Sequence, residues 1–263
     1  MIETHDTAVA AFDQRLETAL RRRLAPPPRL SVAEWADRYR MLSSEASAEP
    51  GRWVTARAPY QREPMDALAD PTVERVVLMW SSQSGKTEVL LNVTGYCAHL
   101  APGPMMMVQP TIQMAEAYSK DRIAPMIRDS PKLTHLFGDP TSRSSGNTLL
   151  HKPFAGGHLT LAGSNAPAAL AGRPIRVLLL DEVDRYPSSA GTEGDPVTLA
   201  VRRTATFALR KILLASTPGV KGESRIEEAF LESDQRHYHV PCPDCQTRQT
   251  LRWQNLRWKE LIA

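Results

Sequence analysis

From residue 73 onwards, short apolar runs alternate with stretches whose apolar residues recur at helical spacing. Continuous apolar runs of this length are typical of strands buried on both faces, as in parallel sheets. Their alternation with helices predicts βαβ units. We therefore expect an α/β fold with a mainly parallel central sheet flanked by helices. Its strands are predicted at Val73–Trp80, Met105–Gln109, Leu159–Ala162, Val177–Leu180 and Ile212–Ala215.

The remaining segments carry other signals. Residues 1–24 have apolar residues at helical spacing and are followed by a proline run, so they predict a helix. Ser31, with Glu34 three residues later, predicts the start of a second helix. Three segments rich in small and turn-forming residues predict loops, the last two of them mobile and at one edge of the sheet: 43–59, 139–157 and 185–198.

Near residue 236 the composition changes towards Cys, Pro, His and Trp, which marks a boundary. We expect N-terminal helices and an extended loop over residues 1–58, and the α/β domain over residues 59–235. Residues 236–263 would then be the start of a small cysteine-containing appendage.

Charge and cysteine content narrow the possibilities. With 32 Lys and Arg against 29 Asp and Glu, the formal net charge of +3 permits a polyanionic partner without requiring one. No apolar run approaches the roughly 20 residues that span a bilayer, and the N-terminus lacks a secretory signal pattern. Three cysteines, one of them isolated, form no disulfide framework. These features favour a protein of the reducing cytoplasm that does not associate with membranes.

The most informative segment runs from a predicted strand through a turn into Gly85-Lys86-Thr87 and a predicted helix. Such a turn directs backbone N–H groups and the positive end of the helix dipole at phosphate oxygens. In a P-loop, or Walker A motif, Lys86 would reach the β- and γ-phosphates of a nucleotide, and the Thr87 hydroxyl would ligate Mg²⁺. The nucleotide-binding residues of this loop would be Ser82, Gln83, Ser84, Gly85, Lys86 and Thr87.

Trp80 stands where the usual P-loop pattern has its first glycine, so the motif is degenerate. The alternative interpretation is a helix N-terminus that carries Lys86 and Thr87 by chance. A second motif, Val177–Glu182, reduces the weight of that alternative. It is an apolar run that ends in two carboxylates, at the rim where ligands bind in open α/β sheets. Asp181 is suited to hold Mg²⁺, and Glu182 to accept a proton from an attacking water molecule.

Two strands are predicted between these motifs along the chain, and a later strand ends in Ser216-Thr217. This layout predicts the RecA-like, additional-strand branch of the P-loop NTPases, in which an extra strand separates the P-loop strand from the Walker B strand. Hydroxyl groups at Ser216 and Thr217 could sense the γ-phosphate and transmit its state, although Ser-Thr-Pro is also common in turns.

The motifs as a set resemble the lambda-type, GpA-like family of viral terminase large subunits. The resemblance covers about residues 30–260 and rests on Pro59–Leu68, Ser81–Glu88, Leu178–Arg185, Arg203–Phe207, Ala215–Pro218 and Val240–Cys245. It implies an ATPase motor that packages double-stranded DNA into a procapsid. It further implies that Tyr60 and Gln61 bind adenine, that Asp181 and Glu182 form the Walker B pair, and that Ser216 and Thr217 couple hydrolysis to DNA movement.

Many members of that family carry a basic residue early in the P-loop, where this chain has Ser81 and Ser82. An arginine that offsets charge on the transferring phosphoryl group must then come from elsewhere. Arg173 matches such an element in some terminases and could act in trans across a ring of subunits. Arg203 is a second candidate. An ordinary surface or structural arginine is equally compatible with both positions.

Cys242 and Cys245 form a C-x-x-C turn, which is half of a zinc ribbon because a closed zinc site needs four ligands. Zinc could be held only with ligands beyond the end of the chain, and free thiols are the favoured interpretation. Residues 1–263 contain no separate acidic cluster for two-metal DNA cleavage. We therefore expect neither a nuclease domain nor nuclease activity in this chain.

These observations predict the ATPase motor domain of a viral terminase large subunit in the host cytoplasm, with Glu182, Lys86 and Arg173 as catalytic residues and ATP and Mg²⁺ as cofactors. The expected partners are double-stranded DNA, the terminase small subunit, the portal of the procapsid and further copies of the chain in a ring. Two alternatives stay open. One is a helicase-like P-loop ATPase, and the other is a non-catalytic assembly module that binds nucleotide weakly.

Overall fold

The computed structural model describes residues 12–18, 20, 21, 24, 26, 28–137, 146–255 and 257. The chain divides into two compact units, Met1–Leu30 and Ser31–Ala263. In the first unit the described residues 12–18, 20, 21 and 24 are helical. This confirms that part of the helix predicted over residues 1–24, and the rest of that prediction lies outside the described residues.

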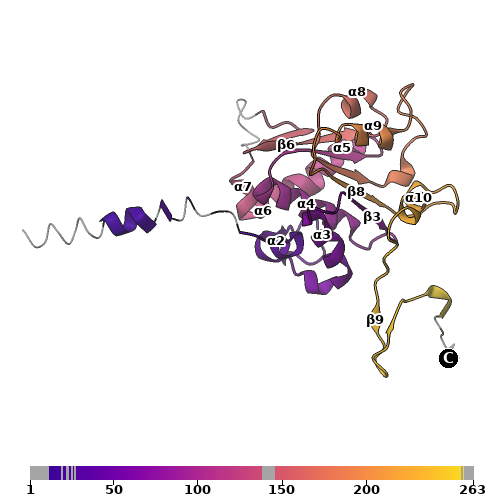
Figure 1. Ribbon diagram of the computed structural model, residues 1–263. Helices are drawn as coiled ribbons and strands as arrows, with labels where there is room; N and C mark the ends of the chain where they lie inside the picture. The colour runs from indigo at the N-terminus through magenta and orange to yellow at the C-terminus, as the bar shows by residue number, and fades with distance from the viewer. Residues whose placement is uncertain are drawn as a thin grey trace, which may run out of the picture. The chain divides into compact units, whose positions relative to one another are not determined.

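The second unit is built on a six-stranded sheet in the order β3-β8-β7-β4-β6-β5 (Figure 1). All neighbouring pairs are parallel except β5 and β6. The predicted α/β fold with a mainly parallel sheet is therefore confirmed, and each predicted strand is present. The strands are β3 (Arg75–Met79), β4 (Pro104–Gln109), β5 (His151–Phe154), β6 (Gly157–Gly163), β7 (Val177–Asp181) and β8 (Lys211–Ser216).

Burial explains why the sequence indicated these strands so clearly. In the central strands β4 and β7, Met105–Val108 and Val177–Leu180 are almost completely buried. A strand with helices on both faces of its sheet has no solvent side, so its apolar residues run continuously instead of alternating. The edge strand β3 is only half-buried, apart from Leu78.

The predicted additional strand lies between the P-loop strand and the Walker B strand. It is β8, which pairs with β3 on one side and with β7 on the other. The three strands that separate these motifs along the chain, β4, β5 and β6, lie beyond β7. The carboxyl ends of β3, β8 and β7 consequently meet at one edge of the sheet, and all three sequence motifs follow those ends.

Helices flank the sheet. In Figure 1, α2, α3, α4, α6 and α7 gather on one side, whereas α8 and α9 lie together on the other. α10 packs against the edge strand β3. The helices are α2 (Val32–Tyr39), α3 (Arg62–Ala69), α4 (Lys86–Leu100), α5 (Ile112–Tyr118), α6 (Ala124–Asp129), α7 (Pro131–Thr134), α8 (Pro167–Ala171), α9 (Pro196–Arg202) and α10 (Arg225–Leu231). A π-helical turn, Ser119–Ile123, joins α5 to α6.

α2 begins as predicted, because Ser31 and Glu34 form a complete capping box. The helix packs against α4 through Trp35, which is fully buried and donates a hydrogen bond from Nε1 to His99 Nδ1 at 3.0 Å. Gly95 makes this close packing possible, since a Cβ atom there would lie 2.2 Å from the indole ring.

Three predicted loops contain short regular elements. Residues 43–59 include β2 (Gly51–Arg52), which pairs with β1 (Met41–Leu42), and the 3-10 turn Thr55–Arg57. The prediction of a loop over residues 139–157 is wrong at β5, which forms the antiparallel edge of the main sheet. This strand has only four residues and contains a proline, which edge strands tolerate, so it gave no strand signal. α9 begins inside the loop predicted over residues 185–198.

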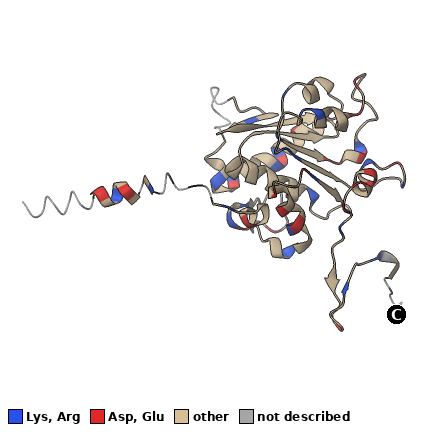
Figure 2. Cartoon of the chain, in the orientation of Figure 1, with Lys and Arg blue, Asp and Glu red and all other residues tan. Residues whose placement is uncertain are grey.

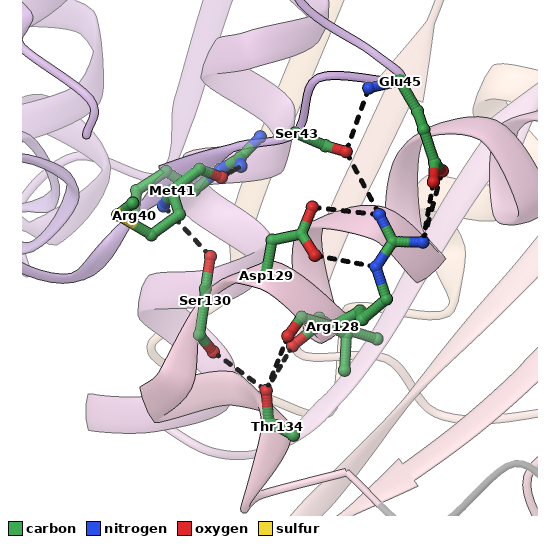
Figure 3. A network of polar contacts seen from close by, with 9 residues as sticks. Arg40, Met41, Ser43, Glu45, Arg128, Asp129, Ser130 and Thr134 are labelled. Carbon is green, nitrogen blue, oxygen red and sulfur yellow. Dashed lines mark hydrogen bonds and ion pairs between the residues drawn. The ribbon is translucent and has the colours of Figure 1, made fainter. Parts of the chain in front are cut away.

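Polar contacts fix the segment after α2 to α6 and α7 (Figure 3). The backbone N–H of Met41 donates to Ser130 Oγ at 3.1 Å. Arg128 forms an ion pair with Glu45 at 3.1 Å and donates to Ser43 Oγ at 3.2 Å. These bonds hold Arg40, at the end of α2, in the interior beside α4.

Figure 2 shows Lys, Arg, Asp and Glu mainly on helices and loops, whereas the strands of the central sheet are mostly of other residue types. Within the described ranges, no helix has the length and apolar character that crossing a bilayer requires. The chain continues beyond α10 into a small hairpin, β9 (Val240–Pro241) with β10 (Arg248–Gln249), and a 3-10 turn, Trp253–Asn255.

Candidate active site

The loop between β3 and α4 is shaped by two residues with left-handed backbone conformations. Gln83 has φ 60° and Gly85, which caps α4, has φ 82°. The Ser84 hydroxyl closes the loop by donating to the carbonyl oxygen of Ser81 at 2.7 Å. A side chain at Gly85 would be unfavourable for two reasons. The positive φ is strained for any residue with a Cβ atom, and that Cβ atom would lie 2.3 Å from Gln61 Nε2.

Lys86 is the central cation of the site. Its side chain is buried, and Nζ donates to the carbonyl oxygens of Trp80 (3.3 Å) and Ser81 (3.0 Å) and to Thr217 Oγ1 (2.9 Å). Nζ also lies 3.8 Å from Glu182 Oε1. One ammonium group thus contacts residues that follow β3, β8 and β7.

Asp181, the last residue of β7, is only 4% exposed. Its Oδ2 accepts a hydrogen bond from Gln109 Nε2 at 3.0 Å, whereas its Oδ1 is buried without a hydrogen-bond partner among the described residues. Burial raises the pKa of this carboxyl group to about 6. Gln109 was not predicted as a site residue. It directly follows a buried apolar run, in the same position at the end of β4 that Asp181 has at the end of β7.

Glu182 has a left-handed backbone with φ 53°, a conformation that is uncommon outside glycine and that clusters at functional sites. It turns the chain out of β7 into the 3-10 turn Val183–Arg185. Asp184 in this turn accepts hydrogen bonds from the backbone N–H groups of Gly219 and Ile226, both at 2.8 Å. The Walker B turn is thereby bound to the loop that follows Ser216 and Thr217.

Tyr60 and Gln61 lie against the same loop. The Tyr60 hydroxyl and Gln61 Nε2 both donate to the carbonyl oxygen of Ser84, at 3.0 and 3.2 Å. The ring of Tyr60 contacts that of Trp80 edge to face, with centroids 5.4 Å apart. The degenerate position of the P-loop is therefore filled by an indole that packs on Tyr60.

These contacts unite the residues that the sequence placed in three separate motifs, and comparison with known proteins identifies the family. The family model of the phage terminase large subunit gpA, ATPase domain, matches residues 47–262. The chain belongs to this family. Nucleotide binding and ATP hydrolysis are therefore its activity class.

Individual relatives agree with this membership. The large subunits of the terminases of Enterobacteria phage P21 and Escherichia phage lambda are each 30% identical to the chain over 240 residues. That alignment covers 90% of the chain but 37% of each relative, so the chain spans little more than a third of their length. The large terminase of bacteriophage HK97 has a similar fold, with a TM-score of 0.58 at 12% identity over 77% of this chain and 41% of that one.

The two candidate arginines of the terminase ATPase domain lie away from this edge of the sheet. Arg173 is exposed, precedes β7 by four residues and lines a cavity of about 300 Å³ with His151 and Thr160, on β5 and β6. Arg203 follows α9, and its carbonyl oxygen accepts from the N–H of Ile175 at 2.9 Å, just before β7 begins. Neither joins Lys86 and Glu182 within one chain.

Cys242 and Cys245 lie in the turn of the β9–β10 hairpin, which is closed by a hydrogen bond from the N–H of Cys242 to Thr247 O at 2.9 Å. Neither cysteine forms a disulfide. In the part of the chain that the structure describes, no group of three or more His, Cys, Asp or Glu side chains is placed to hold a metal ion. His237 contacts Phe230 instead, with ring centroids 5.9 Å apart.

Proposed function

We propose that this chain is the ATP-driven motor of a terminase large subunit, and that the whole protein uses it to package double-stranded DNA into procapsids. One observation carries the proposal: Lys86 joins Thr217 and Glu182 at the edge of the sheet where β3, β8 and β7 end. A site that contacts three strands in this way can connect a change at the phosphates to movement of the segments after β7 and β8.

Each residue of the site has a chemical role in this proposal. Backbone N–H groups of residues 82–85 and the ammonium group of Lys86 bind the phosphates. Glu182, whose side chain is partly exposed beside Lys86, accepts a proton from the attacking water molecule. Ser216 and Thr217 respond to loss of the γ-phosphate, and the bonds of Asp184 carry that response to the loop that begins at Gly219.

The residues present also fit Mg²⁺. Asp181 offers a buried carboxylate oxygen that has no partner in the described ranges, and Thr87 offers a hydroxyl group in the first turn of α4. A small hard cation of this kind is commonly held by one or two protein oxygens together with phosphates. When bound, it would neutralise charge on the β- and γ-phosphates.

Arg173 is proposed to act in trans, in a ring of identical subunits. Its exposure supports this role, as does its distance from its own P-loop. β6, which lines the same cavity, lies four strand positions from β3, or roughly 19 Å at ~4.8 Å per position. Arg203 stays the second candidate.

The same proposal covers the organisation of the whole protein. Residues 59–235 would be the motor, preceded by N-terminal helices and an extended loop over residues 1–58 and followed by the start of a zinc-ribbon-like segment from residue 236. Cys242 and Cys245 would bind zinc only with further ligands from outside the chain. The proposed partners are the terminase small subunit, the portal and duplex DNA, whose backbone would be bound without sequence preference and with strong salt dependence. Nuclease activity would reside outside residues 1–263.

The decisive experiment is ATP hydrolysis by the purified chain, compared with the Lys86→Ala and Glu182→Gln variants, with and without duplex DNA. We expect the wild type to hydrolyse ATP and both variants to lose the activity. Stimulation by DNA would support the packaging role over a DNA-independent ATPase. A different result would favour the non-catalytic assembly module. In that case the wild type binds ATP, but its turnover equals that of both variants even when DNA and the other subunits of the ring are added.

A further inference from the structure

Three side-chain contacts fix the course of the chain that leaves α10, one with α10 itself and two with residues 60–63. His237 packs on Phe230, and Arg236 forms an ion pair with Glu63 of α3 at 2.6 Å. The third contact is Tyr238, whose ring lies edge to face on Tyr60 with centroids 5.9 Å apart. This segment, residues 232–239, is called the linker below.

Tyr238 therefore extends an aromatic row that begins in the P-loop. Trp80 contacts Tyr60, and Tyr60 contacts Tyr238. The row is tied to the phosphate-binding loop at Tyr60, whose hydroxyl donates to Ser84 O at 3.0 Å. Tyr238 is half exposed, so part of this residue is accessible to a ligand next to the loop that would bind phosphates.

A polar atom beside this row also lacks a partner. Gln61 is 3% exposed, and its Nε2 must face the carbonyl oxygen of Ser84, since that oxygen can only accept. This fixes the amide so that Oε1 points elsewhere, and Oε1 has no hydrogen-bond partner in residues 28–137 or 146–255. A buried acceptor without a donor is costly, and a base with an exocyclic amino group would supply the donor.

We propose that Tyr238 is a nucleotide-binding residue, and that the linker forms the outer wall of the site for the adenine base. The inference rests on the proposed ATPase function and deepens it. Aromatic rings bind a base through its π face and contribute nothing to binding of the phosphates. Tyr238 should therefore strengthen the binding of ATP but not the binding of a triphosphate that has no base.

The test is calorimetric titration of the whole chain with two ligands, the β,γ-imido analogue of ATP and inorganic tripolyphosphate. Three variants are compared with the wild type: Tyr238→Ala, Tyr238→Phe, which keeps the ring, and Leu251→Ala, an exposed apolar position outside the linker. We expect Tyr238→Ala to weaken the nucleotide analogue about fivefold and to leave tripolyphosphate unchanged. The other two variants should bind both ligands like the wild type.

Several outcomes would overturn the inference. Unchanged nucleotide affinity in Tyr238→Ala would show that the linker is not part of the site. Tighter binding would mean that the ring obstructs the base, and equal weakening of both ligands would mean that the linker acts through the P-loop. A wild type that binds neither ligand would contradict the proposed ATPase function itself. A thermal melt of each variant shows whether it is folded, so a loss of binding through misfolding can be recognised.

Discussion

The ammonium group of Lys86 lies 2.9 Å from Thr217 Oγ1, although the two residues are 131 positions apart in the chain. With the carbonyl oxygens of Trp80 and Ser81, Thr217 provides partners for all three donors of the ammonium group. The lysine that would bind phosphate is thus oriented by the strand that separates β3 from β7. This gives Thr217 a measurable role in positioning Lys86.

Replacing Thr217 by Val removes this hydroxyl group while keeping the shape of the side chain. A hydrogen bond to a charged group contributes about 1.5–3 kcal/mol, so we expect ATP turnover to fall by roughly one to two orders of magnitude. The melting temperature should change little, because Lys86 keeps two carbonyl partners. Thr206→Val, at an exposed position, is the matched control and should hydrolyse ATP at the wild-type rate. Equal turnover in both variants would exclude the positioning role.

Gln109 should control how tightly Mg²⁺ is held. Its amide orients Asp181 through Oδ2 and leaves Oδ1 without a partner among described residues. Loss of such an orienting partner commonly costs 10–100-fold in metal affinity. In Gln109→Leu we expect the Mg²⁺ concentration that half-saturates ATP hydrolysis to rise about tenfold or more, with full recovery of activity at high Mg²⁺. The control is Gln113→Leu on the exposed side of α5, and a shift of the same size there would contradict the prediction.

Asp181→Asn should stabilise the protein while removing its activity. Burial raises the folded-state pKa of Asp181 from 3.8 to about 6, so the folded state binds the proton more tightly than the unfolded state does. The charged carboxylate of Asp181 therefore lowers the free energy of unfolding. This destabilisation is fully present above the folded-state pKa of about 6 and disappears as the pH falls towards 3.8. Its upper limit is about 3 kcal/mol. Urea unfolding in EDTA should therefore show a more stable variant at pH 8 and a smaller difference at pH 4.5. A variant that is less stable than the wild type at pH 8 would contradict this expectation.

Gly85 combines backbone strain with a steric limit, and two variants separate the effects. Gly85→Ala would adopt φ 82° and place Cβ 2.3 Å from Gln61 Nε2. The conformation alone costs about 1–2 kcal/mol for an L-residue. Gly194→Ala, with φ 95° and open space around the Cβ, has the strain without the clash. We expect Gly85→Ala to lose more stability and to bind nucleotide weakly, and the additional change Gln61→Ala to recover part of the lost stability. Equal losses in both single variants would mean that Gln61 does not restrict this position.

The sequence predicted the central strands and the edge where the motifs meet because both depend on local patterns. Val177–Leu180 is a continuous apolar run, and Asp181 must follow it at the carboxyl end of the strand. β5 was missed because its pairing with β6, rather than its own residues, makes it a strand. Gln109 was missed for a related reason, since its polar partner lies 72 residues away. The pairing of buried polar groups is a property of the packed structure that no local pattern indicates.

The ion pair between Arg40 and Glu88 is a further pairing of a buried polar group, and we expect it to be essential for stability. Arg40 is 3% exposed and lies 3.0 Å from Glu88, in the first turn of α4 next to Thr87. Burial lowers the pKa of Arg40, and Glu88 offsets that cost by favouring the charged form.

Removing one partner of a buried pair typically costs 3–5 kcal/mol, because the other charge is left uncompensated. Glu88 is partly exposed, so we expect Arg40→Met to cost about 3 kcal/mol in urea unfolding and to weaken ATP binding through displacement of the first turn of α4. Arg57→Met breaks the solvent-exposed pair with Glu49 and should change stability by less than about 1 kcal/mol. If both variants unfold at the same urea concentration as the wild type, Arg40 does not anchor the P-loop helix.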